Sequence, residues 1–172
     1  MILSPEYCVT MARYNAWQNR QLKAAFATLD DAALRAERGA FFGSILGTAS
    51  HLLWGDRVWL SRLAGTTLPE GGIGDSPALV TSRGDWEVGR FQTDAALLLW
   101  AEKLRAVDLA GQISWYSGVM GADVAKPIGL CIGHMFNHQA HHRGQIHAML
   151  TAAGAEAPVS DLIFMPEDGP WL

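Results

Sequence analysis

The chain has 172 residues, of which 49% are hydrophobic and 17% are charged. This composition is typical of one folded domain, here taken as residues 1–172, and excludes a disordered chain. The net charge of −4, without any run of lysine or arginine, argues against binding to nucleic acid. No membrane span is expected, because no run of about 18 apolar residues occurs. No signal peptide is expected, and Cys8 and Cys131 form no CxxC pair, so we expect a cytoplasmic protein with reduced thiols.

Apolar residues spaced three and four apart predict helices over the first 64 residues. Ser4, followed by Pro5 and Glu6, is a typical helix start, and the pattern behind it predicts a helix over about 5–28. A shorter helix is expected from residue 30 or 31 to about 39. A second long helix is expected to begin at Ser44 and to end at Gly65.

The second half of the chain alternates between loops and two further long helices. Residues 65–80, rich in glycine and proline, predict a long crossover loop. The next helix is expected over about 82–107, and its predicted inner face consists of Val88, Phe91, Ala95, Leu98 and Leu99. Residues 112–125 indicate a short hairpin or an extended loop. A last long helix is expected from Pro127 to about 153–154. The predicted fold class is therefore all-α, a four-helix bundle with a crossover between the second and third long helices.

Five of the six histidines lie between residues 134 and 147, in the expected last helix. Residues four apart project side by side from one helix face, so His134/His138 and His138/His142 are both candidate pairs for a metal. At about 100° per residue, His142 falls on the centre of the apolar stripe and His138 close to it, whereas His134 lies at its margin. Two imidazoles in an apolar core without a partner are unfavourable, and a metal ion would satisfy both.

A firmly held metal needs a third ligand, and the only histidine outside the cluster is His51, midway along the second long helix. His51 can face inward, although it is not centred on the apolar stripe. The sequence therefore predicts a three-histidine site formed by His51, His138 and His142. The alternative is a histidine-rich patch exposed to solvent.

Three segments resemble motifs of the DinB family. Residues 137–145, Asn-His-Gln-Ala-His-His-Arg-Gly-Gln, are similar to its NHxxHHRGQ signature. The helix around His51 resembles the second motif, and residues 14–19 resemble the N-terminal one. The resemblance implies DinB/YfiT-like bundle topology, frequent homodimers, and a metal, commonly zinc or nickel, on His51, His138 and His142. It also implies a damage-inducible protein, and related members include transferases and isomerases that use low-molecular-weight thiols.

A three-histidine site with open coordination positions suits a metal-dependent transferase or hydrolase acting on a small molecule. Zinc, nickel, copper and ferrous iron suit imidazole ligands better than magnesium or calcium does. The alternative is a non-catalytic, dimeric stress-response protein that binds a metal; binding to DNA is disfavoured by the acidic charge. Residues considered as helpers of the site, each with an ordinary surface or packing role as the alternative, are Tyr14, Asn15, Trp17, Asp56, Arg57, Asn137, Arg143 and Gln145.

Overall fold

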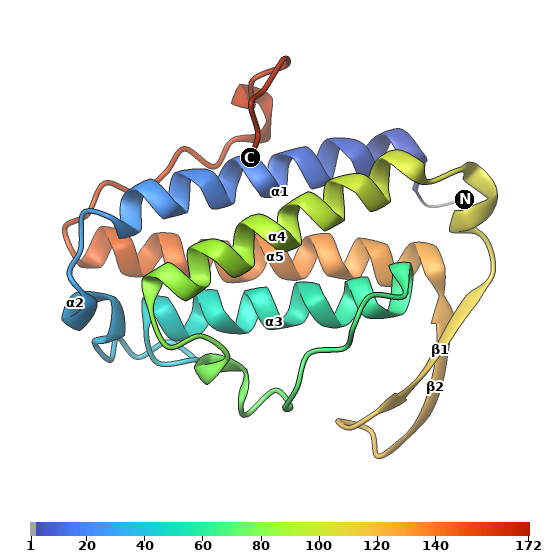
Figure 1. Cartoon of the computed structure of the whole chain (residues 1–172), viewed down its shortest axis with the longest axis horizontal. Helices are drawn as coiled ribbons and strands as arrows, with labels where there is room; N and C mark the ends of the chain where they lie inside the picture. Colours follow the sequence, from blue (N-terminus) through green and yellow to red (C-terminus); the bar gives the residue numbers. More distant parts are fainter. Residues whose placement is uncertain (1–2) are drawn as a thin grey trace.

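The computed structural model describes residues 3–172 and contains four long helices that lie side by side (Figure 1). They are α1 (Pro5–Phe26), α3 (Ile45–Ala64), α4 (Arg83–Lys103) and α5 (Ile128–Ala152). The short helix α2 (Asp31–Arg35) joins α1 to α3, and the strands β1 (Gln112–Ser117) and β2 (Ala122–Pro127) join α4 to α5. Short 3-10 helices cover Ser76–Ala78 (η1), Ala106–Leu109 (η2) and Leu162–Phe164 (η3). Within the described residues, no helix is both long and apolar enough to cross a membrane.

The long helices begin and end where the sequence supplies caps. The side-chain oxygens of Ser4, Ser44 and Ser82 each accept a hydrogen bond from the backbone N–H three residues later, which satisfies a donor that a helix start leaves free. Gly65 ends α3 with φ at 69°, a left-handed conformation that favours glycine. The predicted bounds of α1, α3 and α5 agree with the structure to within two residues.

The predicted inner face of α4 is wrong at three of its five residues, whereas Leu98 is partly buried and packs against the core and Ala95 is half-buried. Val88 and Phe91 are each 60% exposed and Leu99 is 56% exposed. The face that packs against the other helices instead carries Trp86, Gly89, Arg90, Thr93, Asp94, Leu97 and Ala101. The apolar pattern misled the prediction because three of these seven residues are polar, and their partners on other helices cannot be read from the α4 sequence alone. The helix also ends at Lys103 instead of Val107, which lies in η2.

The apolar core consists of two clusters, one towards each end of the bundle. One contains Phe26, Leu53, Trp86 and Ile146, and the other contains Cys8, Trp59, Leu97, Cys131 and Met135. Between them, each long helix contributes buried polar residues: Asn15 and Asn19 of α1, Asp56 of α3, Arg90 and Asp94 of α4, and Gln139 and Arg143 of α5. A polar layer therefore crosses the bundle at mid-length.

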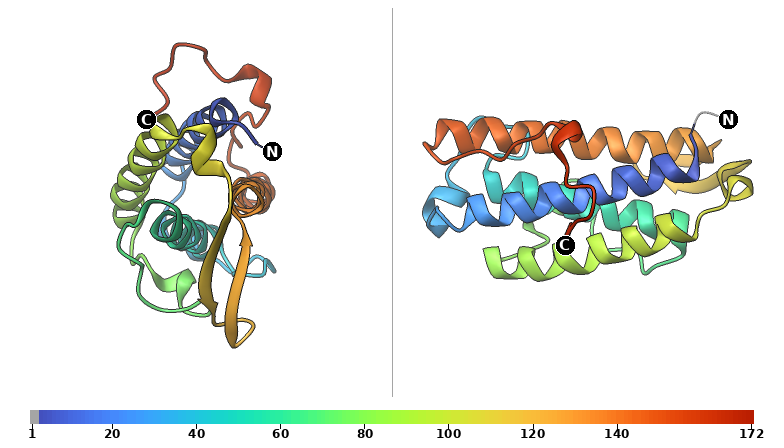
Figure 2. Two further views of the ribbon diagram at one scale, coloured as in Figure 1. Left: turned by 90° about the vertical axis from the view of Figure 1, so that its right-hand side faces the viewer. Right: turned by 90° about the horizontal axis from the view of Figure 1, so that it is seen from above.

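The segment between α4 and α5 is a hairpin, the first of the two structures that the sequence allowed. β1 and β2 pair antiparallel, with Trp115 opposite Val124. The hairpin projects from one end of the bundle on the same side as the crossover loop between α3 and α4 (Figure 1). In the end-on view, α3 and α5 lie next to each other, and the hairpin extends past both (Figure 2). These two connections frame the face on which α3 and α5 meet.

The C-terminal tail crosses the outer side of α1 (Figure 2). The amide of Gln18 donates to the carbonyl of Val159 at 2.7 Å, and the hydroxyl of Tyr14 donates to the carbonyl of Ser160. Both side chains belong to the N-terminal motif of the sequence. Their contacts attach the tail to α1 through its backbone.

Candidate metal centre

The structure brings His51 of α3 together with His138 and His142 of α5. The Nε2 atom of His138 lies 3.2 Å from Nε2 of His51 and 3.0 Å from Nε2 of His142. One ring nitrogen of each histidine lies within 4.8 Å of the others. His51 and His142 are only 4% and 6% exposed. The three Nε2 atoms therefore converge on one point at the interface of α3 and α5.

Hydrogen bonds on the far side of two rings fix which nitrogen carries the proton. The hydroxyl of Ser76 donates to the carbonyl of Ile73 at 2.6 Å, so its oxygen accepts from Nδ1–H of His51, 2.8 Å away. In His142, Nδ1–H donates to Oε1 of Gln145 at 2.7 Å, while the amide of Gln145 donates to Nε2 of His141 at 3.2 Å. His51 and His142 consequently both present an unprotonated Nε2 to the shared point.

This arrangement suits a cation better than it suits hydrogen bonds among the rings. His138 has one Nε2 proton at most, which cannot satisfy the lone pairs of both neighbours with good geometry. Two nitrogens bound to one ion at about 2.1 Å lie about 3.0–3.4 Å apart for angles between about 90° and about 109°. The Nε2 separations of 3.2 and 3.0 Å fall in this range. The donor set and its spacing therefore fit a divalent transition metal.

Burial keeps the three imidazoles neutral. Burial, together with the smaller effect of the neighbouring histidines, lowers the pKa of His51 to about 4 and that of His138 to about 3. Burial also lowers the pKa of His142, partly offset by its hydrogen bond to Gln145. Only neutral imidazole binds a metal, so all three side chains are in the ligating form at neutral pH.

Two residues that the sequence analysis did not assign support the cluster. The ring of Phe42 stacks on His51, with centroids 3.7 Å apart and planes at 20°, and it also lies against His142. Ser76 orients His51 from η1, in the middle of the predicted crossover loop. Neither residue belongs to a motif with metal-ligand spacing, and both come from connections between helices. No local pattern in the sequence would have identified them.

A cavity of about 710 Å³ adjoins the histidine cluster. His51 and His138 form part of its wall, which continues along α3 and α5 as far as Arg62 and His134. The crossover loop and the hairpin supply the other sides through residues 68–73 and 115–119. The cluster thus has one side towards a space large enough for a small molecule.

Gly55 leaves room for the ring of His138. A Cβ atom at this position would lie 3.0 Å from Cε1 of His138, closer than ordinary packing allows. We therefore expect Gly55→Ala to displace the ring and to weaken metal binding roughly tenfold, as disturbing the support of a ligand does. The free energy of unfolding of the metal-free protein should not fall, because alanine favours a helix interior over glycine.

The measurement is metal affinity, by competition with a chromophoric chelator, alongside denaturant unfolding of the metal-free protein. Gly133→Ala is the matched control, since an added Cβ there meets nothing within 4 Å. Equal affinity in Gly55→Ala and the native protein would contradict the role of this glycine.

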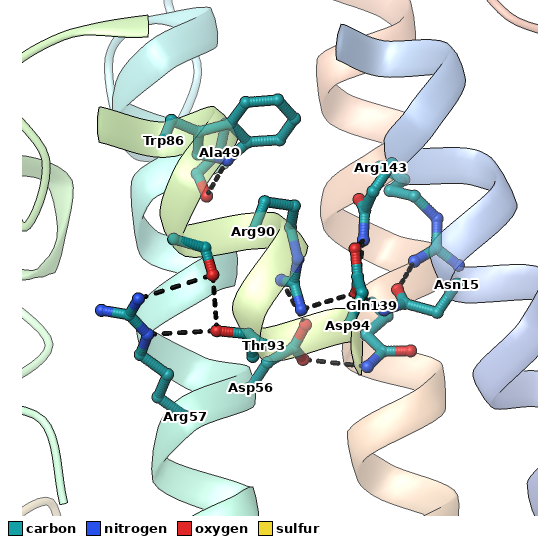
Figure 3. A network of polar contacts seen from close by, with 12 residues as sticks. Asn15, Ala49, Asp56, Arg57, Trp86, Arg90, Thr93, Asp94, Gln139 and Arg143 are labelled. Carbon is teal, nitrogen blue, oxygen red and sulfur yellow. Dashed lines mark hydrogen bonds and ion pairs between the residues drawn. The ribbon is translucent and has the colours of Figure 1, made fainter. Parts of the chain in front are cut away.

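Asp56 and Arg143, two of the considered helpers, belong to the buried polar layer (Figure 3). Neither of them lines the cavity. Arg90 donates to Asp56 at 2.6 Å and lies 2.8 Å from Asp94. Asn15 donates to Asp94 at 2.8 Å and accepts from Arg143. Two buried arginines therefore balance two buried aspartates across four helices.

The layer also supports α5 beside the histidine cluster. The amide of Gln139 donates to the other oxygen of Asp56 at 2.9 Å. Gln139 follows His138 directly, so Asp56 holds the backbone of α5 at the level of the histidine cluster. Its contribution to the site is positional.

The remaining candidates lie away from the cluster, with one exception. Gln145 orients His142, as considered. Arg57 donates to Thr93 at 3.1 Å on the α4 side, and Asn137 is exposed. Trp17 packs against Tyr14, whose ring lies under the guanidinium of Arg143. Among the residues that line the cavity, none comes from α1.

Comparison with known proteins agrees with this architecture. The model of the DinB family matches residues 3–108 and 124–169. Protein DinB of Bacillus subtilis (strain 168) is 26% identical over 160 residues, covering 89% of this chain and 90% of that protein. The crystal structure of a DinB-like protein from Bacillus cereus ATCC 10987 superposes with a TM-score of 0.61 at 22% identity, covering 83% of this chain and 90% of that chain. The chain belongs to the DinB family.

Proposed function

We propose that this protein binds one divalent transition metal through Nε2 of His51, His138 and His142 and acts as a metal-dependent enzyme of the thiol-dependent transferase, isomerase or hydrolase type. The observation that carries the proposal is the pair of unprotonated Nε2 atoms, on His51 and His142, that meet a third imidazole beside a cavity. Zinc or nickel is the expected ion, because imidazole suits both.

When bound, such an ion supplies a Lewis acid that lowers the pKa of a coordinated water or thiol. The residues of the chain prepare the site for that chemistry. Ser76 and Gln145 hold His51 and His142 in the ligating tautomer. The aromatic rings of Phe42 and Trp54 lie against His51 and limit the access of water. The three protein ligands leave coordination positions for a substrate atom.

The test begins with metal analysis of the purified protein and cobalt substitution. We expect one equivalent of metal, and we expect the cobalt absorption spectrum to change when a small thiol is added, because a coordination position is exchangeable. Turnover is then sought with panels of thiols and electrophiles, with His142→Ala as the negative variant. A spectrum that no thiol or anion alters would contradict the enzyme proposal.

The alternative is a non-catalytic, dimeric stress-response protein in which the metal is structural. Its supporting observation is the exposed apolar side of α4, where Val88, Phe91 and Leu99 are 56–60% exposed and a second copy of the chain would cover them. We propose a homodimer for the enzyme as well, testable by sedimentation. A saturated metal site and a large fall in melting temperature on chelation would favour the alternative.

Family membership and the two cysteine thiols support proposals on topology and on cellular location. We propose DinB/YfiT-like topology in one domain. The two cysteines, Cys8 and Cys131, are both buried and unpaired, which supports a reducing, cytoplasmic location.

A further inference from the structure

The face of α3 that lines the cavity carries a histidine at one end and a cation at the other. His51, Gly55, Val58 and Arg62 all line the cavity, and their spacing of four, three and four places them on one helix face. Arg62 follows His51 by eleven positions of helix, a rise of about 16 Å. The cavity is therefore elongated, with the histidine cluster near one end and a guanidinium near the other.

Arg62 has no anionic partner in the described part of the chain. Its guanidinium lies over the rings of Trp59 and Trp115, 4.8 and 4.7 Å from their centroids. No carboxylate within residues 3–172 forms an ion pair with it. Burial lowers the pKa of this guanidinium from its ordinary value, as expected for a cation held partly out of water without a counter-ion. An anion beside Arg62 would be bound in a partly dry environment, where charge pairing is stronger than in water.

The wall between the two ends is largely apolar. It is lined by Trp54, Val58, Trp59, Leu68, Ile73 and Trp115. His134 adds one polar group beside Trp59, with ring centroids 5.3 Å apart. A ligand that fills this space must carry an apolar body, because a polar one would lose its hydration without gaining partners.

We propose that the cavity binds an elongated, amphipathic thiol whose distal carboxylate pairs with Arg62, whose apolar chain lies along the tryptophans, and whose sulfur reaches the histidine cluster. The sulfur end rests on the proposed function, since it requires the metal. The carboxylate end rests only on Arg62 and the cavity walls. The two ends can therefore be tested separately.

The test measures binding of three six-carbon probes to the metal-loaded protein by calorimetry at pH 7. The probes are 6-mercaptohexanoate, 6-mercaptohexan-1-ol and hexanoate, which add or remove the carboxylate and the thiol one at a time. We expect 6-mercaptohexanoate to bind about tenfold more tightly than 6-mercaptohexan-1-ol, the scale of a charged hydrogen bond. Arg62→Met should abolish this preference, and Arg62→Lys should keep most of it.

Arg83→Met is the control, because it removes a partly exposed arginine at the start of α4, outside the cavity, and the preference should persist. The neutral thiol should bind Arg62→Met as it binds the native protein, which shows that the cavity is intact. Equal binding of both thiols to the native protein, or a preference that survives in Arg62→Met, would overturn the proposal. So would loss of binding of both thiols in Arg62→Met without recovery of the preference in Arg62→Lys, because Arg62 would then only support the wall.

The same three probes also test whether the thiol of the ligand contributes to binding. If hexanoate binds as tightly as 6-mercaptohexanoate, and this binding is lost in Arg62→Met, the anion site stands while the thiol-dependent function fails. If 6-mercaptohexan-1-ol binds more tightly than either carboxylate, the thiol function stands and the anion site fails.

Discussion

Replacing His142 by alanine is expected to reduce the metal content of the purified protein from one equivalent to less than about a tenth. Loss of a group that merely supports a ligand costs 10–100-fold in affinity, so loss of a ligand should cost more than about 100-fold. The remaining pair, His51 and His138, would bind the ion from one side only, with Nε2 atoms 3.2 Å apart. The measurement is elemental analysis after desalting, with affinity from chelator competition.

His141→Ala is the matched control, because it removes the adjacent, exposed histidine of the same motif. It should retain the metal, with a small loss of affinity at most through the contact of His141 with Gln145. His134→Ala should also retain it. Equal metal content in His142→Ala and His141→Ala would refute the three-histidine centre, provided that circular dichroism shows both variants to be folded.

The second large effect is expected at Arg90, the centre of the polar layer. Arg90→Met should lower the free energy of unfolding of the metal-free protein by about 3–5 kcal/mol, because it leaves two aspartates buried without their cation. The partners that would be left are Asp56 and Asp94, each no more than 3% exposed. Chemical denaturation of the chelator-treated protein measures the loss.

The pH dependence of this loss has a defined sign. Burial raises the pKa of Asp94 to about 6, although Arg90 beside it favours the charged form. A folded-state pKa above the unfolded value makes stability fall as pH rises between those two values. Without Arg90 the carboxyl group of Asp94 is still harder to ionise. The loss in free energy of unfolding caused by Arg90→Met should therefore be larger at pH 7.5 than at pH 5.

Arg105→Met serves as the control for charge removal. Its ion pair with Asp108 is largely exposed and three residues apart, so the change in stability should be small at either pH and far below that of Arg90→Met. If Arg90→Met lowered the free energy of unfolding as little as this control does, the polar layer would contribute little to stability.

The parts of this structure that the sequence predicts are those encoded locally. Ser44 and Gly65 bracket α3 because a cap acts within one helical turn. His138 and His142 were separated from the other histidines by the apolar stripe of their own helix, and the structure places them inward as that stripe indicates. His51 needed a different argument, since it is not centred on its stripe and was chosen as the one histidine outside the cluster.

The parts that were missed depend on partners distant in the sequence. Arg90 and Asp94 look like surface residues until Asp56 and Asn15 are placed beside them, so the inner face of α4 was assigned mainly to residues that are exposed. Ser76 contacts His51 across 25 positions, and the pair becomes visible only when the crossover loop folds back on α3. Arg62 belongs to no motif, and its environment depends on Trp115 from the hairpin.

The division of the site between helices and connections has an evolutionary consequence. The three histidines stand on α3 and α5, inside segments that match the family, whereas the match pauses between residues 108 and 124, across β1 and the turn of the hairpin. Lineages can therefore lengthen, shorten or recompose that hairpin without disturbing the three histidines, since surface connections tolerate such change better than packed helices. One inherited centre could in this way be adapted to many substrates by altering only what surrounds it.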